Sequence, residues 1–165
     1  MLELRLSELA QSLGVACETD AAMVTGLAID SRSVKPGDLF VAIDGEHVDG
    51  HDFIDKALDS GAAAIACTRA IDVAAPHIKA SDSHQVCAIY GQLIRDRFHG
   101  SVIGITGSAG KTTAKSFLES ICGLAGATVA TLGNQNNELG VPLTLARLSA
   151  CLLYTSPSPR DFQVS

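Results

Sequence analysis

Residues 100–113 read Gly-Ser-Val-Ile-Gly-Ile-Thr-Gly-Ser-Ala-Gly-Lys-Thr-Thr. The segment 101–105 is apolar and rich in β-branched residues, which predicts a buried strand. Residues 106–110 are small and glycine-rich, so the backbone can turn sharply and leave its N–H groups free. From Lys111 onward apolar residues recur every three or four positions, which predicts a helix with the buried stripe Phe117, Leu118, Ile121 and Leu124.

Strand, glycine loop and helix in this order predict a phosphate-binding turn, because loop N–H groups and the positive end of a helix dipole attract anions. Lys111 would reach the terminal phosphates, and the Thr112 hydroxyl would hold Mg²⁺. The common pattern G-x-x-x-x-G-K-[ST] fails, since Ile105 stands where it needs glycine, and the shorter form T-G-S-x-G-K-T-T remains. The alternative is a glycine-rich turn beside a solvated lysine. We interpret the segment as a nucleoside triphosphate site.

The rest of the chain alternates strand and helix patterns, so the sequence predicts an α/β fold. Strands are expected at 26–30, 38–43, 62–67 and 127–131. Helices are expected at 7–13 and 51–60, from residue 81 or 82 to about 99, and after Pro142. We expect a domain boundary between about residues 80 and 100.

Composition narrows the classes of protein. The chain has 165 residues, 47% of them hydrophobic, which is enough for one domain or two small ones. A net charge of −6 with scattered basic residues argues against a nucleic-acid partner. Five cysteines without a C-x-x-C pattern indicate buried free thiols in a reducing compartment. With no membrane-spanning stretch and no signal sequence, the sequence predicts a cytoplasmic protein.

Three further segments carry candidate ligand-binding groups. Asp30-Ser31-Arg32 follows a predicted strand, where the arginine could grip a pyrophosphate or a carboxylate, or could pair with Asp30. Residues 44–52 hold His47 and His51 among four acidic residues. A metal site is conceivable there, but a solvated, helix-capping loop is favoured because the histidines do not share one face. Residues 134–138 hold four amides and a carboxylate, which could contact a ligand or form Asx turns.

Three blocks resemble the Mur ligases, the bacterial enzymes that build the peptide stem of peptidoglycan. Residues 106–113 resemble their ATP loop. Residues 30–45 and 49–53 are similar to the N-terminal UDP-sugar domain of members that add the third residue or the terminal dipeptide. Residues 133–145 resemble members that add D-alanyl-D-alanine. The resemblance covers residues 1 to about 149.

The resemblance implies a fold and a reaction. A UDP-sugar-binding domain would span 1–82, a connecting helix 83–99, and the first strand–loop–helix–strand units of a parallel-sheet ATPase domain 100–149. The reaction would join D-alanyl-D-alanine to UDP-N-acetylmuramoyl-tripeptide through an acyl-phosphate, with ATP and Mg²⁺. Nucleic-acid binding and membrane insertion are not expected. The alternatives are a non-catalytic UDP-sugar-binding module, a diaminopimelate- or lysine-adding Mur ligase, or another phosphate-loop NTPase.

The same resemblance assigns roles by position. The catalytic residue would be Lys111, and Thr112 would bind the metal. Nearest the UDP end of the substrate would be Ser31, Arg32, Gly45 and His47. The cleft between the domains would be lined by Asn134, Asn136 and Asn137. ATP would be bound by Gly107, Ser108, Ala109, Gly110, Lys111, Thr112 and Thr113.

The match spans only about the first third of such an enzyme, so we expect the chain alone to be inactive, with an unpaired sheet edge and uncovered apolar helix faces. The missing parts would supply the carboxylate and histidine at magnesium, a modified lysine and the adenine contacts. Residues 151–161 resemble translated sequencing-adapter DNA. Residues 150–165 are therefore expected to be an aberrant tail, disordered or extended because prolines block a helix.

Overall fold

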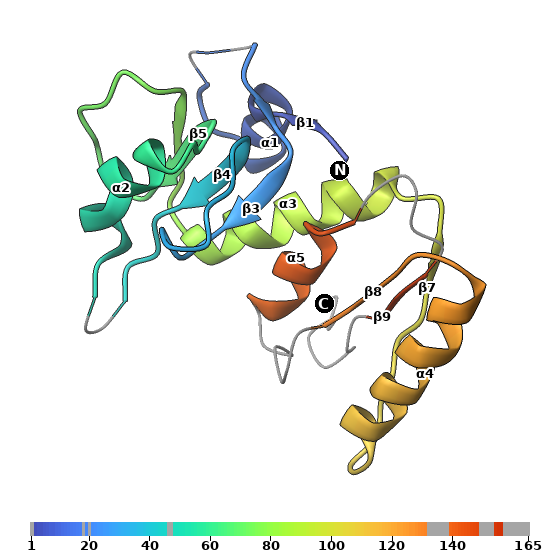
Figure 1. The fold of residues 1–165 in the computed structure, drawn as a ribbon. Helices are drawn as coiled ribbons and strands as arrows, with labels where there is room; N and C mark the ends of the chain where they lie inside the picture. The colour runs from blue at the N-terminus through green and yellow to red at the C-terminus, as the bar shows by residue number, and fades with distance from the viewer. Residues whose placement is uncertain are drawn as a thin grey trace.

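The structure is a computed structural model that describes residues 2–17, 19, 21–45, 48–131 and 139–148, and the backbone of 154–156. Figure 1 shows a larger N-terminal part built on one sheet and a smaller part that carries helix α4 (Lys111–Ala125). The long helix α3 (Ser83–Arg97) runs from the first part toward the second.

The N-terminal part is organised by a four-stranded, fully parallel sheet in the order β3-β4-β5-β6. The register of its first three strands is seen at Leu39, which pairs with Leu27 of β3 on one side and with Ala64 of β5 on the other. A separate antiparallel pair joins β1 (Leu4–Arg5) to β2 (Met23–Val24). The strands expected at 26–30, 38–43 and 62–67 are confirmed with shorter bounds, as β3 (Gly26–Ala28), β4 (Asp38–Val41) and β5 (Ala64–Cys67). The edge strand β6 (His77–Lys79) is an addition to the expected strands.

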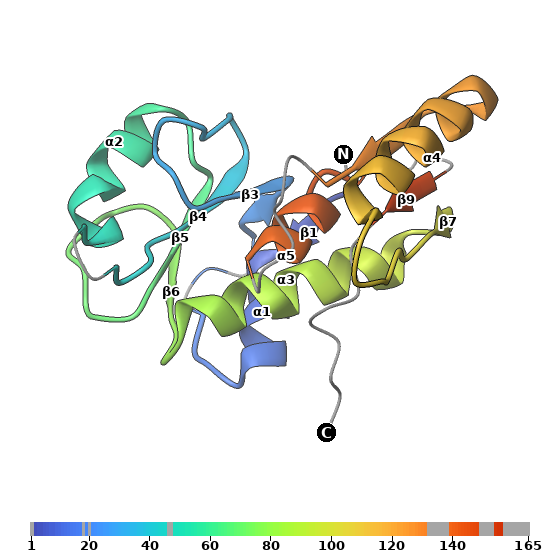
Figure 2. The same ribbon diagram turned by 90° about the horizontal axis from the view of Figure 1, so that it is seen from below.

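Helices cover both faces of this sheet. One face carries α1 (Leu6–Leu13) and α3, and the other carries the 3-10 turn η1 (Gly50–Phe53) and α2 (Ile54–Asp59) (Figure 2). Successive residues of β4 point to opposite faces, so Leu39 and Val41 join the α1–α3 core while Phe40 joins the α2 core. A strand covered on both sides must be apolar on both sides, which explains the continuous run at 39–43.

The smaller part is a second parallel sheet, in the order β7-β9-β8. The strand predicted at 101–105 is only two residues long, β7 (Ser101–Val102), and the strand expected at 127–131 is β8 (Thr128–Ala130). Between them lies β9 (Tyr154–Ser156), from the expected tail. For these three residues the structure shows the extended backbone, one of the two states expected for the tail. The remaining residues of 150–165 lie outside the described residues.

The two parts are joined where α5 (Gly140–Leu145) packs against α3. Gly91, in the middle of α3, faces Pro142 of α5: a Cβ at Gly91 would lie 3.0 Å from the Pro142 Cα. Any side chain at this position would require α5 to shift by a few tenths of an ångström or more. Val141, Leu145 and Leu148 thereby enter the same core as Tyr90 and Ile94.

The apolar stripe predicted to be buried on α4 is mostly exposed. Phe117 is 66%, Ile121 61% and Leu124 90% exposed, and the buried residue of this helix is Cys122. No described element covers the stripe, because the contacts of α4 within the described residues are made mainly with β8 and β9. The prediction of a buried stripe is wrong, and the expectation of uncovered apolar helix faces is confirmed.

Substitution of Leu124 tests this exposure. We expect Leu124→Gln to change the free energy of unfolding by less than about 0.5 kcal/mol, because the side chain loses almost no packing. Urea unfolding followed by circular dichroism measures the change. The matched control is Leu148→Gln at a fully buried leucine, which is strongly destabilising. Equal losses in the two variants would contradict the assignment of Leu124 to the surface.

The described cysteines 17, 67, 87 and 122 are free thiols, as predicted, and three of them are buried. Burial raises the pKa of Cys87 to about 12, so this thiol stays protonated and unreactive at neutral pH. Among the described residues, no helix combines the length and apolar character needed to cross a membrane.

Candidate functional site

The glycine loop between β7 and α4 is exposed and sharply turned. Gly107 (φ 148°) and Gly110 (φ 78°) have positive φ values that side chains other than glycine rarely tolerate. Gly110 is the N-cap of α4, and a Cβ built there would meet nothing within 4 Å. The space in front of this 15-residue helix is therefore open.

The N–H groups at the tip of this loop are free to bind an anion. From residue 106 to residue 113, no backbone N–H has an acceptor within the described ranges. The Lys111 ammonium donates to the Gly107 carbonyl, so it already lies across the loop. The side chains of Thr112 and Thr113 are exposed in the first helical turn. This donor set suits a polyphosphate, and the Thr112 hydroxyl could serve as one ligand of a divalent cation.

A second site is a cavity of about 510 Å³ in the N-terminal part. It lies where the carboxyl ends of β3 and β4 meet, which is where ligands bind in parallel sheets. The cavity is lined by Ser31 and Arg32 from the segment after β3, by Gly45 from the loop after β4, and by Lys56 from α2. The remaining walls are formed by Ile29, Asp30, Phe40, Ile43, Val48, Gly50 and Phe53.

Arg32 is held at the rim of the cavity by Asp30. The guanidinium donates from Nε at 3.0 Å to Asp30 Oδ1 and from Nη2 at 2.7 Å to Asp30 Oδ2. This pairing lowers the pKa of Asp30 from 3.8 to about 2. Asp30 thus stays ionised and fixes the direction of Arg32, whose Nη1 has no hydrogen-bond partner in the part of the chain that is described.

Removal of the guanidinium should raise the pKa of Asp30 toward its ordinary value. We expect its carboxyl ¹³C resonance to titrate near pH 2 in the unsubstituted chain and at a higher pH in Arg32→Gln. The shift is only partly reversed, because the backbone N–H of residue 32 still donates to Asp30 Oδ1. Because the folded-state pKa is depressed, the stabilisation from the pair is complete above the ordinary pKa and is lost as the pH falls toward 2. An unchanged Asp30 midpoint in Arg32→Gln would contradict the pairing.

The structure brings some predicted site residues together and leaves others undetermined. Ser31, Arg32 and Gly45 line one cavity, and residues 107–113 form one exposed loop and helix start. His47, Asn134, Asn136 and Asn137 lie outside the described residues. Sequence reasoning missed Phe53 and Lys56 as cavity residues, although their i, i+3 spacing at a helix start places them on one helical face.

Two parallel sheets, one with a cavity at its strand ends and one followed by a glycine loop, define an α/β protein with a phosphate-loop type of turn. Residues 23–106 match the profile described as Mur ligase family, catalytic domain, and residues 105–151 match the Mur ligase middle domain. The chain belongs to the Mur ligase family.

Relatives of two specificities are similar in sequence. The UDP-N-acetylmuramoyl-tripeptide–D-alanyl-D-alanine ligase of Escherichia coli K12 is 35% identical over 149 residues, which are 90% of this chain and 33% of the relative. The UDP-N-acetylmuramoyl-L-alanyl-D-glutamate–2,6-diaminopimelate ligase of Listeria innocua is 39% identical over 145 residues, 83% of this chain and 29% of the relative. The chain therefore spans about a third of the length of these relatives.

Solved structures agree in fold. The crystal structure of MurF from Acinetobacter baumannii matches with a TM-score of 0.82 and 30% identity, over 96% of this chain and 36% of that one. MurF ligase from Thermotoga maritima, solved in complex with ADP, matches with a TM-score of 0.69 and 34% identity, over 81% of this chain and 31% of that one. The α/β fold with parallel sheets is thus that of the N-terminal region of these ligases.

Proposed function

We propose that the chain is the N-terminal third of an ATP-dependent ligase that adds D-alanyl-D-alanine to UDP-N-acetylmuramoyl-tripeptide in the cytoplasm. The observation that carries the proposal is the exposed loop 106–110, with free N–H groups and a lysine at the start of a long helix. Membership in the Mur ligase family supports the reaction class. Free described cysteines are consistent with a reducing compartment.

In this proposal the loop residues hold the phosphates of ATP. The N–H groups of Gly107, Ser108, Ala109 and Gly110, with those of the first turn of α4, would donate to phosphate oxygens. Lys111 would leave the Gly107 carbonyl and pair with the terminal phosphates, and Thr112 and Thr113 would complete the first turn around them. Thr112 would also be a ligand of Mg²⁺. When bound, ATP and Mg²⁺ would supply an activated phosphoryl group that converts the substrate carboxylate to an acyl-phosphate.

The cavity in the N-terminal part would hold the UDP end of the substrate. Its volume of about 510 Å³ fits a nucleotide-sized ligand. Arg32 and Lys56 would face the diphosphate, and the apolar wall formed by Phe40 and Phe53 would pack against uracil or ribose. His47 completes this group in our proposal, and Asn134, Asn136 and Asn137 would line the cleft toward the other substrate.

The dipeptide-adding specificity is supported by structural likeness. The Acinetobacter baumannii dipeptide-adding enzyme matches with a TM-score of 0.82 at 30% identity. Sequence identity alone does not separate the two specificities, since relatives of both kinds are similar.

Two titrations of the 165-residue chain test the proposed binding roles. We expect saturable binding of ATP with Mg²⁺ and, independently, saturable binding of UDP, each by isothermal calorimetry. Adding UDP to the ATP-saturated chain should release the same heat as adding it to the free chain, because the sites are separate. Amide formation from ATP, tripeptide precursor and dipeptide by this chain alone would contradict the view that the missing two-thirds are needed for catalysis.

A further inference from the structure

Ile43, Gly45, Val48 and Gly50 form one wall of the cavity, and backbone pairing joins the two segments to which they belong. The Gly50 N–H donates to the Ile43 carbonyl at 2.8 Å, and Asp44 and Asp49 form an antiparallel bridge. A Cβ at Gly50 would lie 2.6 Å from the Ile43 nitrogen, so this pairing requires glycine.

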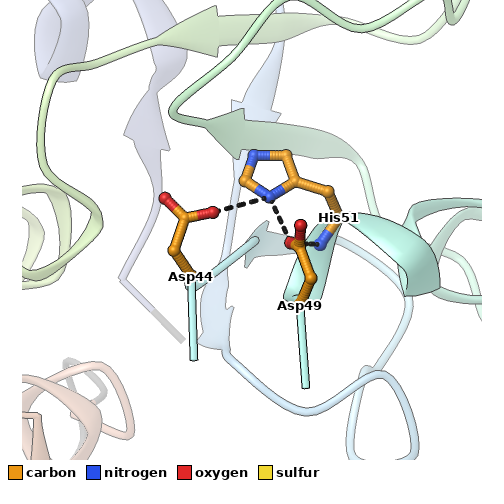
Figure 3. Close-up of side chains that lie close together, drawn as sticks. All are labelled: Asp44, Asp49 and His51. Carbon is orange, nitrogen blue, oxygen red and sulfur yellow. Dashed lines mark hydrogen bonds and ion pairs between the residues drawn. The ribbon is translucent and has the colours of Figure 1, made fainter. Parts of the chain in front are cut away.

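His51 holds the two acidic residues of this loop. Its side chain is 3% exposed, and its Nδ1 lies 2.7 Å from Asp49 Oδ1 and 3.3 Å from Asp44 Oδ1. Figure 3 shows both carboxylates directed at the same ring nitrogen. The His51 backbone N–H also donates to Asp49 Oδ1 at 2.8 Å. The expectation that this loop is merely solvated is therefore wrong for His51, whereas the expected capping by an acidic residue is confirmed for Asp49.

The opposite ring nitrogen fixes the tautomer. The Thr68 backbone N–H donates to His51 Nε2 at 3.1 Å, and a backbone N–H can only donate. Nε2 must therefore be the unprotonated acceptor, and the neutral ring carries its proton on Nδ1, where it donates to Asp49.

This tautomer argues against a metal at the cluster. The ligand atoms of Asp44, Asp49 and His51 lie within 4.8 Å of one another, so spacing alone would allow an ion. A metal ion on Nδ1 would require the ring proton to lie on Nε2. That N–H would then face the Thr68 N–H, which is also a donor. A metal-bound histidine normally points its other N–H at an acceptor. Asp49 Oδ2 also accepts from Arg69. The cluster is therefore a hydrogen-bond network.

The network ties the cavity loop to the end of β5. The Thr68 hydroxyl donates to Asp44 Oδ2 at 2.7 Å, and Arg69 pairs with Asp49. Donation from the His51 N–H and ring, with Arg69, lowers the pKa of Asp49 to about 2, so this carboxylate remains a charged acceptor. Residues after β4 and β5, adjacent strands of the sheet, are thus locked together behind the cavity wall.

We propose that His51 is a positioning residue for the sugar-nucleotide cavity: its Nδ1–H tautomer, set by Thr68, holds Asp44 and Asp49, and thereby places the neighbouring wall residues Gly45, Val48 and Gly50 for binding the nucleotide. The inference rests on the proposed function, because the ligand is the UDP moiety assigned above. His51 itself does not line the cavity; it acts through the loop that does.

Calorimetric UDP titration of the full chain, four variants of the network and one control variant tests the proposal. His51→Ala should bind UDP about tenfold or more weakly, because the ring's two partly buried hydrogen bonds, with Asp49 and with the Thr68 N–H, are lost. His51→Gln keeps an acceptor for the Thr68 N–H and His51→Asn keeps a donor for Asp49, so each should recover part of the affinity. Thr68→Val keeps the backbone N–H and removes only the hydroxyl, and should cost about three- to tenfold. The matched control is His84→Gln, an exposed histidine that also lies beside an aspartate, with Nδ1 3.6 Å from Asp82 Oδ1.

Two further readouts separate positioning from folding. Two-dimensional ¹⁵N–¹H NMR of the imidazole should show the proton on Nδ1 of His51, and far-UV circular dichroism identifies any variant that does not fold. If His51→Ala is unfolded, His51→Gln and His51→Asn decide the question, because each removes one of the two ring contacts. Wild-type UDP affinity in the folded His51 variants, or a proton on Nε2 of His51, overturns the positioning role of His51 but not the proposed nucleotide site. A flat UDP titration of the unsubstituted chain overturns the proposed nucleotide site and the role together.

Discussion

Lys111→Met should weaken ATP binding about 10- to 100-fold, because a charge-assisted hydrogen bond to phosphate is worth about 1.5–3 kcal/mol. The ammonium already lies over the loop, on the Gly107 carbonyl, and the loop N–H groups have no acceptor within the described ranges. Methionine keeps the length and the helix preference of lysine. Calorimetric ATP titration measures the loss.

The stability of Lys111→Met should not fall, since lysine in a first helical turn opposes the helix dipole. Lys79→Met, on the edge strand β6, is the matched control and should bind ATP like the unsubstituted chain. An unchanged ATP affinity in Lys111→Met would reject the phosphate-binding role of the loop and leave only the N-terminal cavity as a candidate site.

Gly91→Val should reduce the free energy of unfolding by about 1–3 kcal/mol, the usual cost of overpacking a close contact. A Cβ at this position would already lie 3.0 Å from the Pro142 Cα and 3.4 Å from Leu145 Cδ1. The branched side chain would therefore push α5 away from α3 and open the core shared by the two parts. Urea unfolding measures the loss.

The control for Gly91→Val is a second glycine in a helix. Gly123 lies inside α4, and a Cβ there meets nothing within 4 Å. Gly123→Ala should stabilise the helix by up to about 1 kcal/mol, because alanine loses less backbone entropy than glycine. If Gly91→Val is tolerated as well as Gly123→Ala, the two helices are not in close contact.

Local patterns were enough to predict most elements. The strand expected at 38–43 is confirmed as β4; its continuous apolar run at 39–43 is typical of a strand covered on both faces, and β4 is internal in the sheet. The helix expected from residue 81 or 82 is capped by Asp82, whose side chain accepts the His84 N–H at 2.8 Å. These signals are read within a few residues, so they need no knowledge of distant contacts.

Side-chain partners across the chain could not be predicted in the same way. Periodicity shows that Phe117, Ile121 and Leu124 share one helix face, but not whether another element covers that face. The role of His51 depends on Thr68, a contact that spans 17 residues and forms only because β4 and β5 are neighbours in the sheet. Spacing between two histidines in the sequence carries no information about such a contact.

The sequence alone determined the α/β class, the glycine loop before a helix and the family resemblance, because each is written in neighbouring residues. The tertiary structure alone decided that β9 lies between β7 and β8, that Gly91 faces Pro142 and that one histidine links two loops behind the cavity. These features depend on which surfaces come into contact when the sheets form. Close packing and the satisfaction of buried hydrogen-bonding groups select among the possible arrangements.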